Sequence, residues 1–324
     1  MTLTKTQYIG ALQCPKNVWL SVNRKDIHPE QKDNSYINIG NIIGEEAKKY
    51  FSGGLEIDSA SLDITQASKD TLSAMTNGAK IIYEATAINP DNDTNARIDI
   101  LQLDEINKCW NLIEVKSSSN IKDYQLDDIS FQYYVFNAAG YNIGECYIMA
   151  PNKEYQLDGV HDIKDFFQLN NLTEEIIERQ DYVIKNIDKF IDQIKSKEEI
   201  NINIGAKCYK PFECGYINHC WNDIPEYSIF NVFTKPKAER IYQDHGPKIS
   251  DLPKDLWPAG DKYNELLAHL NKKIKFDKDN IINFLKELKY PLFFLDYETI
   301  SPPIPIVQGT SPYQQYLFNI LYTN

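Results

Sequence analysis

The sequence lacks a long apolar run. None of its 324 residues belongs to a stretch that approaches the length of a membrane span, and residues 1–10 contain no apolar signal core. This absence argues against an integral membrane protein and against a secretory leader. We therefore predict a cytoplasmic protein.

An excess of positive charge is also absent. Lys and Arg total 34 against 46 Asp and Glu, which gives a formal net charge of −12. Such a chain is poorly suited to coating nucleic acid non-specifically, although it leaves room for an enzyme with a locally basic groove. The cationic residues that would supply this groove are Arg97, Lys116, Lys122, Lys207 and Lys210.

The rest of the composition is that of a globular protein. Apolar residues make up 42% of the chain and charged residues 25%. This length suits two domains, or one domain with appendages. Six cysteines in a cytoplasmic chain are not expected to pair as disulfides, so their placement matters more than their number.

Two short segments, 97–101 and 112–116, predict a β-hairpin. Each is apolar or alternating over a strand length, and the polar residues 104–108 between them suit a turn. Residues i and i+2 of a strand share a face, so Glu114 and Lys116 should point the same way. Antiparallel pairing would bring Asp99 beside them.

This group of charges indicates a metal site. Two neighbouring carboxylates repel each other unless a hard cation lies between them, and Mg²⁺ or Mn²⁺ prefers oxygen ligands of this kind. A lysine beside the metal can orient an attacking water or stabilise charge that builds on a phosphate. The alternative is an ordinary hairpin with solvated charges on its outer face, because Glu-x-Lys is common in strands.

The segments that flank the hairpin predict an α/β core. Residues 79–87 form a strand that completes a three-stranded antiparallel meander, and a helix over 123–139 followed by a strand over 141–149 extends it. In that helix Gln132 comes soon after the Glu-x-Lys strand, which favours a substrate contact over a plain surface amide. Asp128 lies four residues before it on the same stripe.

Three further carboxylates lie near these elements. A helix over 40–51 carries Glu45 and Glu46 early, where the helix dipole favours acidic side chains. The functional alternative is that Glu45 is a third metal ligand reaching the hairpin. Glu84, in the strand over 79–87, is interpreted as an edge-facing carboxylate in preference to a neighbour of the site.

The second half of the chain predicts fewer regular elements. A long amphipathic helix covers 173–195, and a polar connector over 225–278 carries one helix. Residues 290–299 predict a buried strand that ends in Asp296-x-Glu298, again two acidic residues on one strand face. The chain stops at Asn324, soon after this strand.

Three cysteines at six-residue spacing, Cys208, Cys214 and Cys220, lie in a loop with Pro and Gly. This placement indicates a metal centre, with Cys14 as a fourth thiolate ligand. Alternatively His219 replaces Cys14, which would suit zinc better. Three unrelated cysteines are the remaining interpretation, although thiols clustered in an exposed loop have little packing use.

The order of these motifs resembles the RecB-like, PD-(D/E)xK nuclease family. The residues that carry the resemblance are Gly40-x-x-x-Gly44-Glu45, Asp99, Glu114-Val115-Lys116 and Gln132. Cys14 and the three later cysteines resemble its iron–sulfur branch, which includes AddB-type helicase-nucleases and the RecB-like exonucleases of CRISPR adaptation modules. Gly44 stands where the family usually has a histidine, and the cysteine spacing is wider than is common in that branch.

The C-terminal segment is similar to the opening of a DnaQ/exonuclease-I-like domain. The matching residues are 294–299, the prolines of 302–305 and Pro312-Tyr313-Gln314-Gln315. A largely uncharacterised bacterial family joins the same two modules in this order. The further acidic motifs of the second module would lie beyond Asn324, so we expect that module to be inactive here and the sequence to be a fragment or a shortened product.

The resemblance implies a fold and an activity. The expected fold is a restriction-endonuclease-like mixed sheet with flanking helices, closed by a cysteine-bound cluster and followed by a truncated RNase H-like segment. The expected domains are a nuclease over 1–225, a helical connector over 226–288 and the truncated module over 289–324.

The implied reaction is phosphodiester hydrolysis in DNA, favouring single-stranded ends. Asp99 and Glu114 would bind Mg²⁺ or Mn²⁺ with help from Glu45, while Lys116 and Gln132 act on water and substrate. A structural [4Fe–4S] cluster would bind Cys14, Cys208, Cys214 and Cys220, with Zn²⁺ as the alternative. The contrasting hypothesis is a nucleic-acid-binding or scaffold protein that keeps the fold without the activity.

Overall fold

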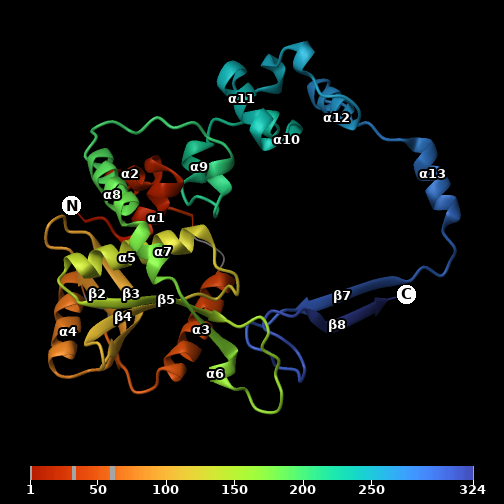
Figure 1. Cartoon of the computed structure of the whole chain (residues 1–324). Helices are drawn as coiled ribbons and strands as arrows, with labels where there is room; N and C mark the ends of the chain where they lie inside the picture. The colour runs from red at the N-terminus through yellow and green to blue at the C-terminus, as the bar shows by residue number, and fades with distance from the viewer. Residues whose placement is uncertain (1, 31–33, 59–62, 324) are drawn as a thin grey trace. The chain divides into compact units, whose positions relative to one another are not determined.

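The hairpin extends into a six-stranded mixed sheet in the computed structural model of the chain (Figure 1), which describes residues 2–30, 34–58 and 63–323. The strands, in both chain and sheet order, are β1 (Leu55–Glu56), β2 (Ile81–Ile88), β3 (Asn95–Asp104), β4 (Cys109–Val115), β5 (Ile143–Pro151) and β6 (Phe167–Asn171). The predicted mixed sheet with flanking helices is confirmed. The short strands β1 and β6 are additions that the sequence patterns did not indicate.

The predicted meander forms the middle of this sheet. Strand β2 pairs antiparallel with β3, and β3 pairs antiparallel with β4. Strands β1 and β5 join their neighbours in parallel, and β6 closes the far edge antiparallel to β5. The connection from β4 to its parallel neighbour β5 runs through a helix, as parallel pairing requires.

That connecting helix is α5 (Asp123–Ala138), within one residue of its predicted bounds. It begins after Lys122, whose backbone N–H donates to the Gln125 side chain at 2.9 Å. Its buried residues include both apolar side chains, such as Phe131, and polar ones, such as Gln132. A helix that buries amides and carboxylates beside a sheet must place them against polar partners.

Helices cover both faces of the sheet, and each face has its own core. On one face α5 packs with α1 (Lys5–Gln13), α2 (Pro15–Asn23), α4 (Ile64–Thr76), α7 (Thr173–Glu178) and α8 (Gln180–Ile194). On the other face lie α3 (Asn34–Tyr50) and α6 (Ile163–Phe166). We call the core on the α5 side the first core and the core on the α3 side the second core. The predicted helix over 173–195 is thus two helices that meet at Arg179.

Tyr8 fixes helix α1 against its neighbours. Its side chain is fully buried and stacks on Phe131 of α5 at 4.7 Å between ring centroids, with Phe190 of α8 edge-on at 5.8 Å. The backbone just before α1 also joins the sheet, since Asn95 N–H donates to the Leu3 carbonyl at 3.2 Å. The start of α1 is therefore held from two sides.

The chain divides into two compact units. The first comprises residues 1–200 with 301–315, and the second comprises 201–300 with 316–324. The second unit contains α9 (Ile217–Cys220), α10 (Ile229–Val232), α11 (Lys235–His245), α12 (Asp261–Leu270), α13 (Lys278–Glu287) and the 3₁₀ turns 206–209, 249–251 and 254–256. The domain boundaries expected from the sequence stay a prediction.

Two expectations for the second unit are wrong. The segment 225–278 is not a polar connector with one helix, because Ile229, Ile241 and Leu266 belong to a small apolar core of its own. The strand over 290–299 is not buried. It is β7 (Phe294–Ile300), paired antiparallel with β8 (Tyr316–Thr323), and its Leu295 side chain is 68% exposed.

Residues 301–315 pack within the first unit, although they connect β7 to β8. Gly309 N–H donates to the Leu157 carbonyl at 2.8 Å, and Leu157 N–H donates to the Thr310 carbonyl at 3.0 Å. Ile304 contacts the second core, and the Tyr313 hydroxyl donates to the Ser117 carbonyl.

Among the residues that the structure describes, no helix is long and apolar enough to cross a membrane.

Candidate active site at the ends of strands β3 and β4

Asp99 and Glu114 lie opposite each other where the β3–β4 ladder ends. The last pair of that ladder is Ile100 with Ile113, so the next residues in register are these two acids. The Asp99 carboxylate accepts a hydrogen bond of 2.6 Å from the Val115 backbone N–H, which ties the two strand ends together. The expected juxtaposition of two carboxylates is therefore present.

Glu114 is the centre of a buried polar network. It is 2% exposed, and its Oε1 accepts from Lys116 Nζ at 2.6 Å and from Lys5 Nζ at 2.9 Å. Its other oxygen, Oε2, accepts from Gln132 Nε2 at 2.9 Å. The Lys116 contact confirms that Glu114 and Lys116 share a strand face.

Helix α5 supplies the other side of the network. Asp128 and Gln132 are one helical turn apart, so both project toward Glu114. Asp128 Oδ2 accepts from Lys116 Nζ at 2.6 Å, and its Oδ1 accepts from Gln132 Nε2 at 3.1 Å. Asp128 therefore binds both a cation and an amide of the site, a role that sequence reasoning did not assign to it.

Lys5 is the residue that sequence reasoning missed. It is the first residue of α1, and its Nζ lies 2.9 Å from Glu114 Oε1 and 3.5 Å from Asp128 Oδ1. One signal could have drawn attention to it. A lysine in the first turn of a helix opposes the helix dipole, so its presence there needs a compensating acidic partner.

Glu84 is in register with Asp99 on the neighbouring strand. The β2–β3 pairs Tyr83 with Ile100 and Ala85 with Ile98 leave Glu84 and Asp99 facing each other between them. Glu84 has φ 55°, a left-handed conformation that is unusual for a strand residue other than glycine. This register favours the interpretation of Glu84 as a neighbour of the site.

The left-handed residue changes which face β2 presents. Ile82 and Ala85 both belong to the first core, whereas Tyr83 belongs to the second. Strict alternation would put Ile82 and Ala85 on opposite faces. Residues other than glycine in this sparsely populated conformation cluster at active sites. The Glu84 carboxylate lies 3.7 Å from Arg97, and burial raises its pKa.

The network contains more carboxylates than ammonium groups. Burial and the neighbouring Glu114 carboxylate raise the pKa of Asp99 to about 7, against the lowering effect of Lys5 and Lys116. Burial alone would also raise the pKa of Glu114, but Lys116 and Lys5 outweigh it and hold that pKa at about 2. Asp99 is thus the carboxylate whose charge is poorly compensated, which is the condition that a bound cation would relieve.

The donor set fits a hard divalent cation. Asp99 and Glu114 offer carboxylate oxygens, the ligands that Mg²⁺ and Mn²⁺ prefer. The Oε1 atom of Gln132 is buried and lacks a hydrogen-bond partner in the described part of the chain, so it is available to a water or a cation. In the same described residues, no group of three or more His, Cys, Asp or Glu side chains is arranged to hold a metal.

Glu45 is not brought to this network. Its side chain is 67% exposed and pairs with Lys48 at 2.9 Å, and Lys48 in turn pairs with Glu56 at 2.6 Å. Its neighbour Glu46 lies nearer the protein interior and pairs with Lys49. The role of Glu45 as a metal ligand remains a prediction without a contact to support it.

The cysteines of the predicted cluster lie in both units. Cys14 separates α1 from α2 in the first unit, and the other three lie in the second. Within the second unit, Cys214 N–H donates to the Cys208 carbonyl at 2.8 Å, which closes the loop, and Cys220 ends helix α9. The iron–sulfur cluster and its zinc alternative on His219 stay predictions.

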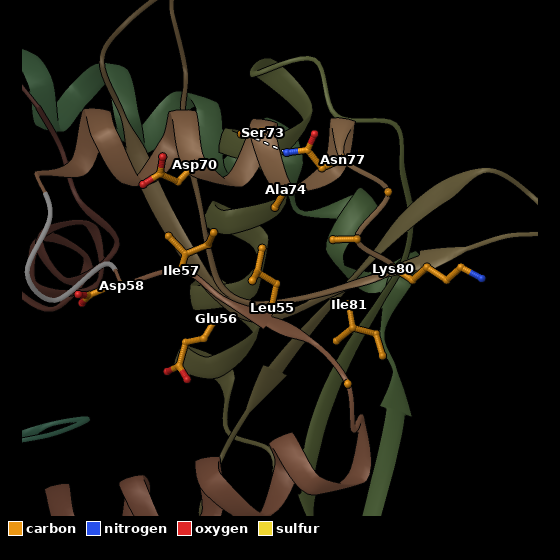
Figure 2. A pocket seen from close by; sticks show the side chains of 13 residues that line it. Leu55, Glu56, Ile57, Asp58, Asp70, Ser73, Ala74, Asn77, Lys80 and Ile81 are labelled. Atoms are coloured by element: carbon orange, nitrogen blue, oxygen red, sulfur yellow. Dashed lines mark hydrogen bonds between the residues drawn. The ribbon is translucent and has the colours of Figure 1, made fainter.

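A cavity of the first unit lies at another part of the sheet (Figure 2). It has a volume of about 610 Å³ and lies between β1, the end of α4 and the start of β2, lined by residues such as Leu55, Asn77 and Ile81. None of the network residues lines it. The proposed chemistry therefore has no connection with this cavity.

Comparison with known proteins gives weak likenesses. Residues 293–322 match a family model described as a domain of unknown function, DUF2779. The crystal structure of SSO0001 is similar at 13% identity and a TM-score of 0.28, covering 68% of this chain and 85% of that one. An alkaline exonuclease from Laribacter hongkongensis is similar at 12% identity and a TM-score of 0.26, covering 58% and 93%. No curated protein matches the sequence.

Proposed function

We propose that the chain is a metal-dependent nuclease that hydrolyses phosphodiester bonds in DNA, acting as an exonuclease on single-stranded ends. The observation that carries the proposal is the meeting of Asp99, Glu114 and Lys116 at the ends of two adjacent strands. Gln132 from α5 is fully buried beside them. Buried ionisable groups add little stability, because an apolar cluster would stabilise the fold at least as well. Their presence here therefore favours a functional role.

Asp99 and Glu114 would hold Mg²⁺ or Mn²⁺ through their carboxylate oxygens. When bound, such an ion supplies Lewis-acid stabilisation of the phosphate and lowers the pKa of a coordinated water. Val115 N–H fixes Asp99, and Gln132 Nε2 fixes Glu114, so both carboxylates are oriented by the protein before any ligand arrives. This orientation reduces the reorganisation needed during the reaction.

Lys116 is the residue proposed to act on the reacting groups. Its ammonium group is held by Glu114 and Asp128, each at 2.6 Å. Burial alone would lower the pKa of Lys116, but those carboxylates outweigh it and raise that pKa, so Lys116 stays protonated and serves as a fixed positive charge rather than as a base. It would therefore orient the attacking water or stabilise charge on the phosphate.

A structural [4Fe–4S] cluster on Cys14, Cys208, Cys214 and Cys220 is part of the same proposal. The six-residue spacing and the backbone bond between Cys214 and Cys208 support it. A metal clip between residues so distant in sequence would constrain the unfolded chain strongly. Zinc bound with His219 in place of Cys14 is the competing assignment. The two can be distinguished because an iron–sulfur cluster is brown and a zinc site is colourless.

A binding or scaffold protein without activity is the second candidate. The observation that favours it is that Glu114 Oε1 already accepts from two ammonium groups, Lys5 and Lys116. A carboxylate compensated in this way has less need of a metal ion. The two candidates predict the same nucleic-acid partner and differ in whether the partner is cut.

The test is degradation of end-labelled single-stranded DNA with Mn²⁺ or Mg²⁺, using protein purified without oxygen. Wild type is compared with Asp99→Ala, Lys116→Ala and the matched control Lys80→Ala, which removes a 61% exposed lysine paired with Glu105. Activity lost in the first two variants and kept in the control supports the proposal. Binding without cleavage by wild type favours the scaffold, and activity that survives both substitutions removes this site from the reaction.

A further inference from the structure

Lys5 occupies a helix position that disfavours it. The first turn of a helix carries partial positive charge from its unpaired N–H groups, and acidic residues are favoured there. The cap of α1 is already complete, because Thr4 Oγ1 accepts from Gln7 N–H and the Gln7 side chain accepts from Thr4 N–H. Lys5 adds nothing to this cap, so its position is explained by its contacts with Glu114 and Asp128.

The backbone around Lys5 is held by contacts on both sides. Leu3, two residues earlier, bonds to Asn95 at the start of β3, and Tyr8, three residues later, is stacked between two helices. These contacts hold the Lys5 backbone at a position from which its ammonium group reaches the ends of β3 and β4. A site residue held in this way needs little ordering when a ligand binds.

The two lysines of the site are held differently. Lys116 has contacts of 2.6 Å to both Glu114 and Asp128, and its side chain is 18% exposed. Lys5 has one contact of 2.9 Å and a looser one of 3.5 Å, and its side chain is 27% exposed. An ammonium group has three donors, and Lys5 uses one of them in a hydrogen bond where Lys116 uses two, so Lys5 has the greater capacity for a further acceptor.

We propose that Lys5 binds a phosphate oxygen of the nucleic-acid backbone next to the Asp99–Glu114 carboxylates, an inference that rests on the proposed nuclease function. If the phosphate draws Lys5 outward, Glu114 keeps its bonds to Lys116 and Gln132. The two lysines then have different roles. Lys116 stays fixed on the reacting groups, and Lys5 offsets the repulsion between this acidic site and an anionic substrate.

The test is the salt dependence of binding. A labelled single-stranded oligonucleotide, as DNA and as RNA of the same sequence, is titrated with the full chain in EDTA and again with Ca²⁺. Because Lys5→Gln leaves one phosphate without its cation, the negative slope of log K against log salt should become shallower by about 0.7. Lys5→Arg should keep the wild-type slope, and Lys80→Gln is the control of equal charge. With Mn²⁺, Lys5→Gln should raise KM by about tenfold and change kcat less.

A second measurement needs no variant. An oligonucleotide that carries a photoreactive group on its backbone is cross-linked to wild type, and the linked residues are identified by mass spectrometry. Cross-links should form at Lys5 or its immediate neighbours and not at Lys80. An unchanged slope and no cross-link near Lys5 in a protein that binds and cuts DNA would overturn the Lys5 assignment alone. Wild type that neither binds nor cuts would overturn the proposed function with it.

Discussion

The site at the strand ends and the cysteine loop over 208–220 are two regions predicted to bind metals, and they are built differently. At the strand ends, side chains from α1, the end of β4 and α5 already contact one another, and Asp99 of β3 accepts from the Val115 backbone N–H, through hydrogen bonds of 2.6 to 3.1 Å. In the cysteine loop, the backbone closes on itself through the hydrogen bond from Cys214 N–H to the Cys208 carbonyl at 2.8 Å.

The difference shows what each region depends on. Sheet pairing and core packing position Asp99, Glu114 and Gln132, so that geometry exists without a ligand. A thiolate site has no such support when it lies in a loop, and its geometry comes mainly from the metal itself. We therefore expect the first region to tolerate removal of its metal and the second to depend on it.

The largest expected effect comes from Glu114→Ala. It leaves Lys5 and Lys116 without their shared acceptor, and breaking a buried pair of this kind costs about 3–5 kcal/mol of unfolding free energy. Cleavage should fall by at least about 10²-fold. Urea unfolding and the end-labelled DNA assay measure the two effects, with Glu56→Ala as the exposed control. A variant as stable as wild type would mean that the network is not the support described above.

Cys214→Ser probes the other side of the comparison. If the cluster forms, visible absorbance and bound iron should fall to background, and the urea midpoint should fall because the link between Cys14 and the loop is lost. Cys109→Ser, in strand β4, is the control and should keep the colour. A colourless protein that contains zinc would favour the His219 assignment. A full brown cluster in Cys14→Ser would contradict the four-thiolate arrangement.

A smaller effect should appear as a pH dependence of stability. The pKa of Asp99 is raised to about 7 in the folded chain, so between about pH 4 and pH 7 the folded state keeps a proton that the unfolded state has released. Stability therefore falls as pH rises through this window, by at most about 1.4 kcal/mol per pH unit.

Urea unfolding of wild type and Asp99→Asn between pH 4.5 and pH 7.5 measures this slope. The variant should lose it. The lowered pKa of Glu114 acts below pH 4.5, where stability is lost as that carboxylate is protonated, and so lies outside the window. An equal slope in both proteins would mean that another group titrates there.

The smallest effect is expected from Glu45→Gln. An exposed pair at this spacing on a helix contributes about 0.3–0.5 kcal/mol, so stability should hardly change. Because Glu45 pairs with Lys48 and is not brought to the network, cleavage should stay within about twofold of wild type, well below the effect of removing a ligand. A decrease comparable to that of Asp99→Ala would instead establish Glu45 as a ligand, as the family resemblance implies.

Local patterns were enough to predict the centre of this molecule. The alternation around Asp99 and Glu114, and the i, i+2 spacing of Glu114 and Lys116, depend only on strand geometry, and the structure keeps both. The bounds of α5 followed from helical spacing in the same way.

What could not be predicted depends on contacts between distant residues. Lys5 reaches Glu114 across 109 positions of sequence, which no local pattern encodes. The left-handed conformation of Glu84 lies within strand β2, at a position where the sequence has no glycine to indicate it. The apolar strand β7 resembled a buried one, but its exposure is decided by what covers it rather than by its residues.

The segment 301–315 means that the two units are not consecutive blocks of sequence. The chain passes from one unit to the other after Ile200, after Ile300 and after Gln315. A chain ended at Ile200 would lack the bonds that Gln308 makes in both directions with Gly159, and the Ile304 contact with the second core. The first unit therefore has no single cut point, and separating it would require rejoining two stretches of the gene.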